Sequence, residues 1–281
     1  MHRWFVAGVV CCLAAVGTLS AAELEARTIA AYEKYIAVLQ QSFSQRTNSD
    51  VFLEHGSPQQ LERLRQGEIL LAPGSGDGIT DAPGGLIHHW RATTFIAGVK
   101  LADVLRSVRN YSTYHSIYPW MIASELVAHE GDRYRAFFRM RRSAGRVTGV
   151  LDLWSVTDYR SVRSDRVASV SDIECVRQVE NAGEQLERRL PPGTGKGYLW
   201  RAHTFSKYFE RDGGVYIELD TVGLTRDYPA MLGWIIEPIA RRLGRGSAAD
   251  SLSSLRRVMT SSQPATAEPA RVQLTRAWCG A

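Results

Sequence analysis

Hydrophobic positions follow a helical period near both ends of the chain and a strand period between them. Over residues 24–43 apolar side chains recur at spacings of three and four, which predicts an amphipathic helix. A second, short helix is predicted to begin after Ser57, because Ser57 is a good N-cap, Pro58 suits a first turn and Gln60 completes a capping box. Gly67 is placed to end this helix.

The middle of the chain is predicted to form an antiparallel sheet. A strand is expected over residues 86–96, a helix over 101–108 and a broken helix over 111–120, and the glycine-rich residues 73–85 are expected to be a loop. From residue 121 the apolar period is two, and turn residues separate most of six further strands: 121–128, 133–142, 147–159, 167–179, 198–210 and 215–225. Because short connections force consecutive strands to pair antiparallel, we expect one antiparallel arrangement.

The helical period returns in the last part of the chain. It runs from Pro229 to residue 239, and Ser247 is predicted to cap a final helix whose apolar residues are Leu252, Leu255, Val258 and Met259. Residues 261–281 show no apolar period and are expected to be a disordered tail. No repeat or linker divides residues 23–260, which are therefore expected to form one domain.

The segment 1–22 is predicted to be a secretory signal peptide that is cleaved after Ala22. His2 and Arg3 give a positive start, and residues 4–16 form an uncharged apolar run shorter than the roughly twenty residues of a spanning helix. The alternative is an uncleaved N-terminal anchor. No later stretch is apolar enough to span a membrane, so we expect a soluble mature chain that is periplasmic or secreted.

Composition narrows the class of protein only slightly. Of the 281 residues 44% are hydrophobic and 22% charged, which excludes a wholly disordered, collagen-like or coiled-coil chain. The chain has 34 Lys and Arg residues against 29 Asp and Glu, and this small basic excess only weakly indicates anionic partners. Cys175 and Cys279 remain after removal of the signal; an oxidising compartment permits a disulfide, and the sequence leaves their pairing open.

The last two predicted strands define two faces if Glu210 lies opposite Val215 across the turn at residues 212–213. One face is small or hydroxyl-bearing in its middle and so leaves room; it carries Trp200, Ala202, Thr204, Ser206 and Tyr208 opposite Thr225, Gly223, Thr221, Leu219 and Ile217. The other face holds the charges, including a complementary Lys207–Glu218 pair and Asp220, and is expected to meet solvent. Its aromatic residues Phe205, Phe209 and Tyr216 fit that expectation poorly.

One face of the strand at residues 133–142 carries four arginines: Arg133, Arg135, Arg139 and Arg141. We expect these side chains to be solvated. The alternative is a surface that faces an anion or a lipid headgroup. Asp152 also lies on a predicted strand and is expected to point outward.

Three stretches resemble the START-like, or SRPBCC, superfamily: GGLIHHWRATTFIAGV at residues 84–99, YLWRAHTFSKYFERDGGVYIELDTVGLTRDYPAMLGWIIEPI at 198–239, and the helix after them. The resemblance covers roughly residues 60–260. More specifically, these stretches resemble a secreted bacterial branch of the superfamily. It implies an α+β helix-grip fold, in which a curved antiparallel sheet wraps a long C-terminal helix and encloses a cavity. Members carry lipids, sterols and other apolar ligands, and a minority are cyclases or hydrolases. The superfamily has no shared catalytic motif that would assign a role to any residue here.

For the other motifs, a structural interpretation is favoured over a functional one. PPGTGKG at residues 191–197 lacks the first glycine and the final hydroxyl of a phosphate loop, and a strand pattern follows it instead of a helix. Gly74, Gly76 and Gly78 precede no helix, so they favour a flexible loop, with a lid over the cavity as the alternative. His88 and His89 point to opposite faces of a strand and cannot share one metal ion. No nucleophile elbow or Cys–His pair is present.

The function expected from these observations is binding of a hydrophobic or amphipathic, lipid-like small molecule by an exported protein. The alternatives are a cavity-based hydrolase or cyclase, and a structural or partner-binding protein with a collapsed cavity. No cofactor, metal or nucleic acid is expected; transient membrane contact and the oligomeric state are left open. Trp154, like the other tryptophans, fits either a cavity or a core. The candidate cavity residues are Trp90, Phe138, Trp200, Thr204, Ser206, Tyr208, Leu219, Thr221 and Trp234.

Overall fold

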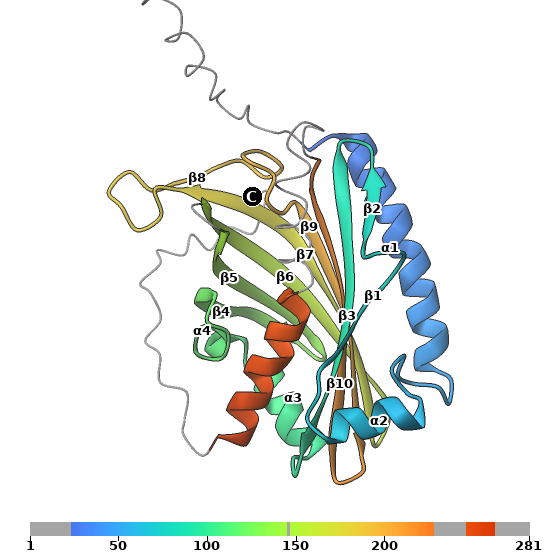
Figure 1. Cartoon of the computed structure of the whole chain (residues 1–281). Helices are drawn as coiled ribbons and strands as arrows, with labels where there is room; N and C mark the ends of the chain where they lie inside the picture. Colours follow the sequence, from blue (N-terminus) through green and yellow to red (C-terminus); the bar gives the residue numbers. More distant parts are fainter. Residues whose placement is uncertain (1–23, 145–146, 228–245, 262–281) are drawn as a thin grey trace, which may run out of the picture.

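In the described part of the chain, ten strands form a single antiparallel sheet that curves around one helix (Figure 1). The computed structural model describes residues 24–144, 147–227 and 246–261. The main strand order is β1-β3-β10-β9-β7-β6-β5-β4, with β2 paired to β3 and β8 to β7. The strands are β1 (Leu70–Pro73), β2 (Ile79–Ala82), β3 (Gly85–Ala97), β4 (Met121–Glu130), β5 (Arg133–Ala144), β6 (Val147–Arg163), β7 (Arg166–Glu180), β8 (Arg188–Arg189), β9 (Arg201–Arg211) and β10 (Gly214–Arg226).

The helices are confirmed close to their predicted positions, except that Ser247, predicted to cap the last helix, lies inside it. They are α1 (Ala26–Thr47), α2 (Pro58–Arg65), α3 (Leu101–Arg109), the 3-10 turn η1 (Tyr111–Thr113), α4 (Tyr114–Ile117) and a C-terminal helix over residues 246–260. The capping box of α2 is present, with the Ser57 side chain accepting from the Gln60 backbone and the Gln60 side chain accepting in return. Gly67 follows with a φ of +92°, a conformation that glycine adopts without strain.

The segment 73–85, predicted to be a loop, contains the strand β2 (Ile79–Ala82), which its sequence pattern does not predict. β2 pairs with β3, and the segment before it folds back on the same strand, where Gly74 N donates to His89 O at 2.9 Å. A side chain at Gly74 would clash, because a Cβ there would lie 2.1 Å from His89 Nε2. By contrast, residues 191–197 precede β9 without forming a helix, as a strand pattern predicted.

The inner, hollow face of the sheet packs against the C-terminal helix, α3, η1 and α4. Its largest hydrophobic cluster joins Val104 and Val108 of α3 to Leu252 and Leu255 of the C-terminal helix and to Ile217 of β10. These side chains are at most 5% exposed. Burial of this cluster holds the helix across the sheet.

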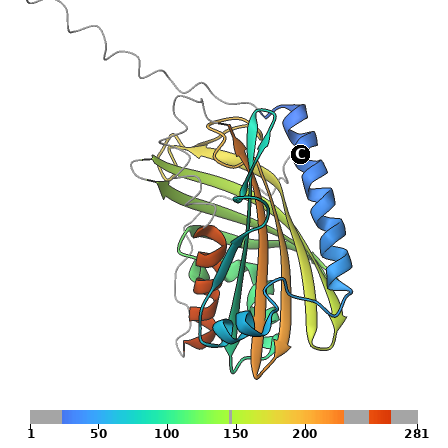
Figure 2. The same ribbon diagram turned by 45° about the vertical axis from the view of Figure 1, so that its right-hand side comes forward.

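The outer face of β9 and β10 is covered by other parts of the chain, and this corrects the expectation that its charged residues meet solvent. α1 runs along it (Figure 2), with Tyr32 and Ile36 in one hydrophobic cluster with Phe205. The segment after α1 places Phe52 in a second cluster with Phe209 and Tyr216. Lys207 and Glu218 are consequently buried. The pattern within the strands cannot show that a distant helix covers this face. The aromatic residues Phe205, Phe209 and Tyr216 on it were the only sign in the sequence that it is covered.

The arginine face of β5 is solvated only in part. Arg133, Arg135 and Arg141 are exposed, whereas Arg139 is 4% exposed and forms a bidentate ion pair with Asp152. Asp152 is fully buried and also accepts from Arg189 of β8. Asp152 thus points to the outer side as expected, but the chain around β8 removes it from solvent.

Several expectations lie outside the described residues: the signal peptide, the helical stretch at residues 229–239, the tail, Trp234 and Cys279. Cys175 is buried and disulfide-bonded. None of the described helices is long and apolar enough to cross a membrane.

Candidate functional site: a cavity between the sheet and the C-terminal helix

A cavity of about 210 Å³ lies on the inner face of the sheet, beneath the C-terminal helix. Three parts of the chain build it: the sheet from β5 to β10, the segment from α3 to β4, and the C-terminal helix. Its lining residues are Val108, Tyr111, Tyr114, Tyr118, Trp120, Met121, Phe138, Ser155, Thr157, Tyr159, Ser169, Ser171, Thr204, Ser206, Tyr208, Ile217, Leu219, Thr221, Ser251, Leu252 and Leu255.

Six of the nine candidate cavity residues line this space: Phe138, Thr204, Ser206, Tyr208, Leu219 and Thr221. They meet there because β9 and β10 pair in the predicted register, with Glu210 opposite Val215 and Ser206 opposite Leu219. The face with small residues in its middle is therefore the inner face.

The two remaining described candidates, Trp90 and Trp200, are buried elsewhere. Trp90 pairs with Thr221 on the inner face, but its ring packs against Gly78, where an added Cβ would lie 2.5 Å from it. Trp200 precedes β9 and joins the hydrophobic cluster under α1, so strand parity does not govern its direction. Trp154 is 5% exposed and packs against Phe137 at 5.2 Å, as a core residue.

Hydroxyl groups form a row across the floor of the cavity. Thr157 pairs with Ser171, Ser171 with Thr204 and Thr204 with Thr221, so the row crosses β6, β7, β9 and β10. Thr157 donates to Ser171 at 3.0 Å, and Thr221 donates to the Trp90 carbonyl at 3.1 Å. Adjacent strands lie about 4.8 Å apart, so the floor offers polar contacts at regular intervals.

The wall formed by the segment η1–α4 is aromatic, and none of its tyrosines is among the candidate cavity residues. Tyr111, Tyr114 and Tyr118 all come from the segment η1–α4, and Tyr114 stacks on Phe138 at 5.3 Å between ring centroids. Tyr114 donates to Val108 O at 2.6 Å, which fixes its ring against α3. The high number of tyrosines in residues 111–118 could have indicated this aromatic wall. A broken helix, however, has no regular period that would assign these tyrosines to one face.

The chemistry of the lining is neutral. Among its described residues none is an acid, a lysine, an arginine, a histidine or a cysteine. The phenols do not add a charge, because burial raises the pKa of Tyr111 to about 12 and raises the pKa values of Tyr114, Tyr118 and Tyr208. This lining can bury a neutral, partly polar molecule, and it offers no group suited to acid–base catalysis near neutral pH.

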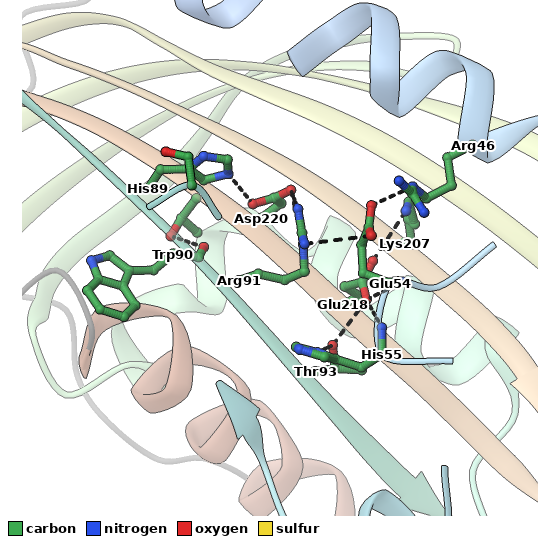
Figure 3. Close-up of polar contacts among 12 residues, drawn as sticks. Arg46, Glu54, His55, His89, Trp90, Arg91, Thr93, Lys207, Glu218 and Asp220 are labelled. Carbon is green, nitrogen blue, oxygen red and sulfur yellow. Dashed lines mark hydrogen bonds and ion pairs between the residues drawn. The ribbon is translucent and has the colours of Figure 1, made fainter. Parts of the chain in front are cut away.

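Ionisable groups gather instead on the outer face, beneath α1 (Figure 3). His89 Nε2 lies 2.5 Å from Asp220 Oδ1, and Arg91 Nη2 lies 2.6 Å from Asp220 Oδ2. Burial alone would raise the pKa of Asp220, but the contacts with His89 and Arg91 hold it below its ordinary value. Tyr35 of α1 reaches His89 Nδ1 at 2.8 Å. This network ties α1 to the sheet.

The histidine pair at the start of β3 does not form a metal centre. His88 contacts Thr225 Oγ1 at 2.9 Å on the inner face, whereas His89 contacts Asp220 on the outer face. Among the described residues, no group of three or more His, Cys, Asp or Glu side chains is placed to hold a metal ion.

The curved antiparallel sheet, with a C-terminal helix across its hollow face and a cavity between them, is the α+β helix-grip fold that the sequence resemblance predicted. No family model and no curated protein matches the chain. A STAR-related lipid transfer protein from Xanthomonas axonopodis is similar in structure, with 16% identity and a TM-score of 0.44; the match covers 66% of this chain and 100% of that one.

Two other solved structures illustrate the range of similar proteins. Human STARD10 has 8% identity and a TM-score of 0.39, with 74% of this chain and 83% of that one covered. The Zhui aromatase/cyclase from Streptomyces sp. R1128 has 13% identity and a TM-score of 0.38, with 62% and 97% covered.

Proposed function

We propose that this protein binds a neutral, largely apolar small molecule in the cavity between the sheet and the C-terminal helix. The observation that carries the proposal is the composition of the lining, which joins apolar and aromatic walls to a floor of hydroxyls. Binding sites for small molecules combine these two features, with a few polar groups that orient an otherwise apolar ligand.

A binding role fits this cavity better than its two alternatives. A hydrolase or cyclase would need an acid, a base or a nucleophile at the ligand, and the described lining supplies only hydroxyls and phenols of raised pKa. A partner-binding protein with a collapsed interior would leave no space, whereas about 210 Å³ is open here.

The direct test is native mass spectrometry of the purified full-length chain, followed by solvent extraction and mass analysis of the extract. We expect a stoichiometric added mass that leaves on denaturation and reappears in the extract as a neutral compound. A protein that carries no added mass and takes up neither 2-naphthol nor dodecan-1-ol would contradict the proposal.

We further propose that the protein acts outside the cytoplasm after cleavage behind Ala22. Support comes from the positive start, the short apolar run and the small residues at positions 20–22. N-terminal sequencing of the mature protein should begin at Glu23. An intact Met1 on protein from the cell envelope would contradict cleavage and favour an anchor.

A further inference from the structure

Two hydroxyls in the cavity lining lack a hydrogen-bond partner within the part of the chain that the structure describes. One is Thr204 Oγ1, in the middle of the hydroxyl row on β9. The other is the phenol of Tyr118, on the wall formed by α4 and β4. Tyr118 is only 9% exposed. Thr204 is partly buried. A hydroxyl that faces the cavity without a partner in the protein is free to form a hydrogen bond with a bound ligand.

The neighbouring hydroxyls are already engaged, which distinguishes these two. Thr157 donates to Ser171, Thr221 donates to the Trp90 carbonyl, and Ser251 donates to the Ser247 carbonyl at 2.8 Å. Tyr111 and Tyr159 bond to each other at 3.1 Å, and Tyr208 forms hydrogen bonds with Ser206 and Ser169. Thr204 and Tyr118 therefore remain available, from the sheet and from the aromatic wall respectively.

The volume of the cavity limits what can lie between the two hydroxyls. An apolar cavity of about 150 Å³ holds a benzene molecule, and pockets for drug-sized ligands begin near 300 Å³. At about 210 Å³ this cavity holds one or two rings and is too small for a lipid with two acyl chains. The stacked pair of Tyr114 and Phe138 supplies a flat apolar surface for such a ring.

We infer that the ligand is a neutral compound of one or two rings with a hydrogen-bonding oxygen at each end, one for Thr204 and one for Tyr118. This inference rests on the proposed function and deepens it, because it names the ligand class and the two residues that select it. The absence of ionisable groups from the described lining excludes a carboxylate or an amine at either end, since a buried charge without a partner is costly.

Three probes of graded polarity test the inference on the full-length protein by isothermal titration calorimetry. Naphthalene-2,6-diol has an oxygen at each end, naphthalene has none, and dodecan-1-ol represents an acyl chain. We expect the diol to bind at least tenfold more tightly than naphthalene, because each neutral hydrogen bond is worth about 2- to 12-fold in affinity. Equal affinities for diol and naphthalene, or selective binding of dodecan-1-ol, would overturn the inference and leave the proposed function intact. Failure of all three probes to bind would overturn both.

Two substitutions locate the contacts. Thr204→Val and Tyr118→Phe each remove one hydroxyl with little change of shape, so each should weaken diol binding about 2- to 12-fold without changing naphthalene binding. Thr148→Val, at an exposed hydroxyl of β6, is the matched control and should change neither. The melting temperature of each variant separates loss of fold from loss of contact. Diol affinity that is unchanged in both folded cavity variants would overturn the assignment of these two residues.

Discussion

Lys207 Nζ lies 3.2 Å from Glu218 Oε1 across the β9–β10 pair, and both side chains are at most 5% exposed. The partner oxygen of Glu218 accepts from the backbone of Glu54 at 2.9 Å and from Thr93 Oγ1 at 3.2 Å. Lys207 in turn lies 5.6 Å from the ring centroid of Phe43 in α1. One buried ion pair thus joins the sheet to the N-terminal helix and to the segment that follows it.

Breaking this pair from one side should be strongly destabilising. Glu218→Gln leaves the Lys207 ammonium buried without a carboxylate, and a comparable loss elsewhere costs about 3–5 kcal/mol. Urea unfolding followed by tryptophan fluorescence measures the change. The double variant Lys207→Met/Glu218→Leu should recover much of the loss, because it leaves no unpaired charge. A Glu218→Gln protein that loses less than about 1 kcal/mol of unfolding free energy, roughly a fivefold change in the folding equilibrium, would show that the pair is not buried as described.

His203 Nδ1 lies 3.3 Å from the Tyr32 hydroxyl of α1, so protonation of His203 should weaken the attachment of α1. Burial and the nearby Arg201 lower the pKa of His203 to about 4 from an ordinary value of 6.5. The unfolded chain therefore binds more protons than the folded chain between pH 6.5 and 4, and stability falls as the pH falls through this range. The loss from this group is at most about 3 kcal/mol.

Neighbouring groups modify this pH dependence in known directions. Burial also lowers the pKa of His55, which adds to the loss, whereas burial raises the pKa of Asp172 to about 6, which opposes it. His203→Gln removes one contributor, so its melting temperature should fall less than that of the parent between pH 7 and 4.5. Equal falls in the two proteins would refute the assignment to His203.

The C-terminal helix should be essential for folding. Leu252 and Leu255 are at most 4% exposed, and removing a buried leucine side chain costs about 2–5 kcal/mol. A chain that ends at residue 245 should give no cooperative thermal transition. A chain that ends at residue 261 should retain a cooperative transition. Both chains lack residues 262–281 and are compared in reducing buffer, so the difference between their melting curves reports the contribution of the helix. Similar melting of the two would contradict a single domain over residues 23–260.

Local patterns predicted those features that local physics decides. The capping box at Ser57, the turn at residues 212–213 and the resulting register of β9 and β10 all depend on neighbouring residues, and all three are present. The register in turn placed Thr204, Ser206 and Thr221 on one face, where they line the cavity.

The errors arise where a distant segment decides the outcome. Lys207 and Glu218 have the pattern of a solvent face, and they are buried because α1 and residues 48–56 cover them. Trp200 was predicted to face the cavity from the alternation of residues along β9, but β9 begins only at Arg201. Tyr118 had no period that could place it, because its ring is positioned by packing among Tyr114, Trp120 and the sheet.

Ser206 lies in the lining of the cavity that is proposed to hold the ligand, and one comparison of variants tests this proposal directly. Ser206→Trp fills part of the space, whereas Thr148→Trp places the same side chain at an exposed position of β6. The binding of 2-naphthol to the full-length parent and to both variants is followed by its fluorescence, and each protein is melted in parallel.

We predict that Ser206→Trp loses most 2-naphthol binding while its melting temperature stays within a few degrees of the parent, since 1 kcal/mol corresponds to about 2–4 °C for a domain of this size. Thr148→Trp should bind as the parent does. A large fall in the melting temperature of Ser206→Trp would mean that Ser206 lies in packed core, where overpacking costs about 1–3 kcal/mol or more. Unchanged binding by Ser206→Trp would contradict the location of the ligand.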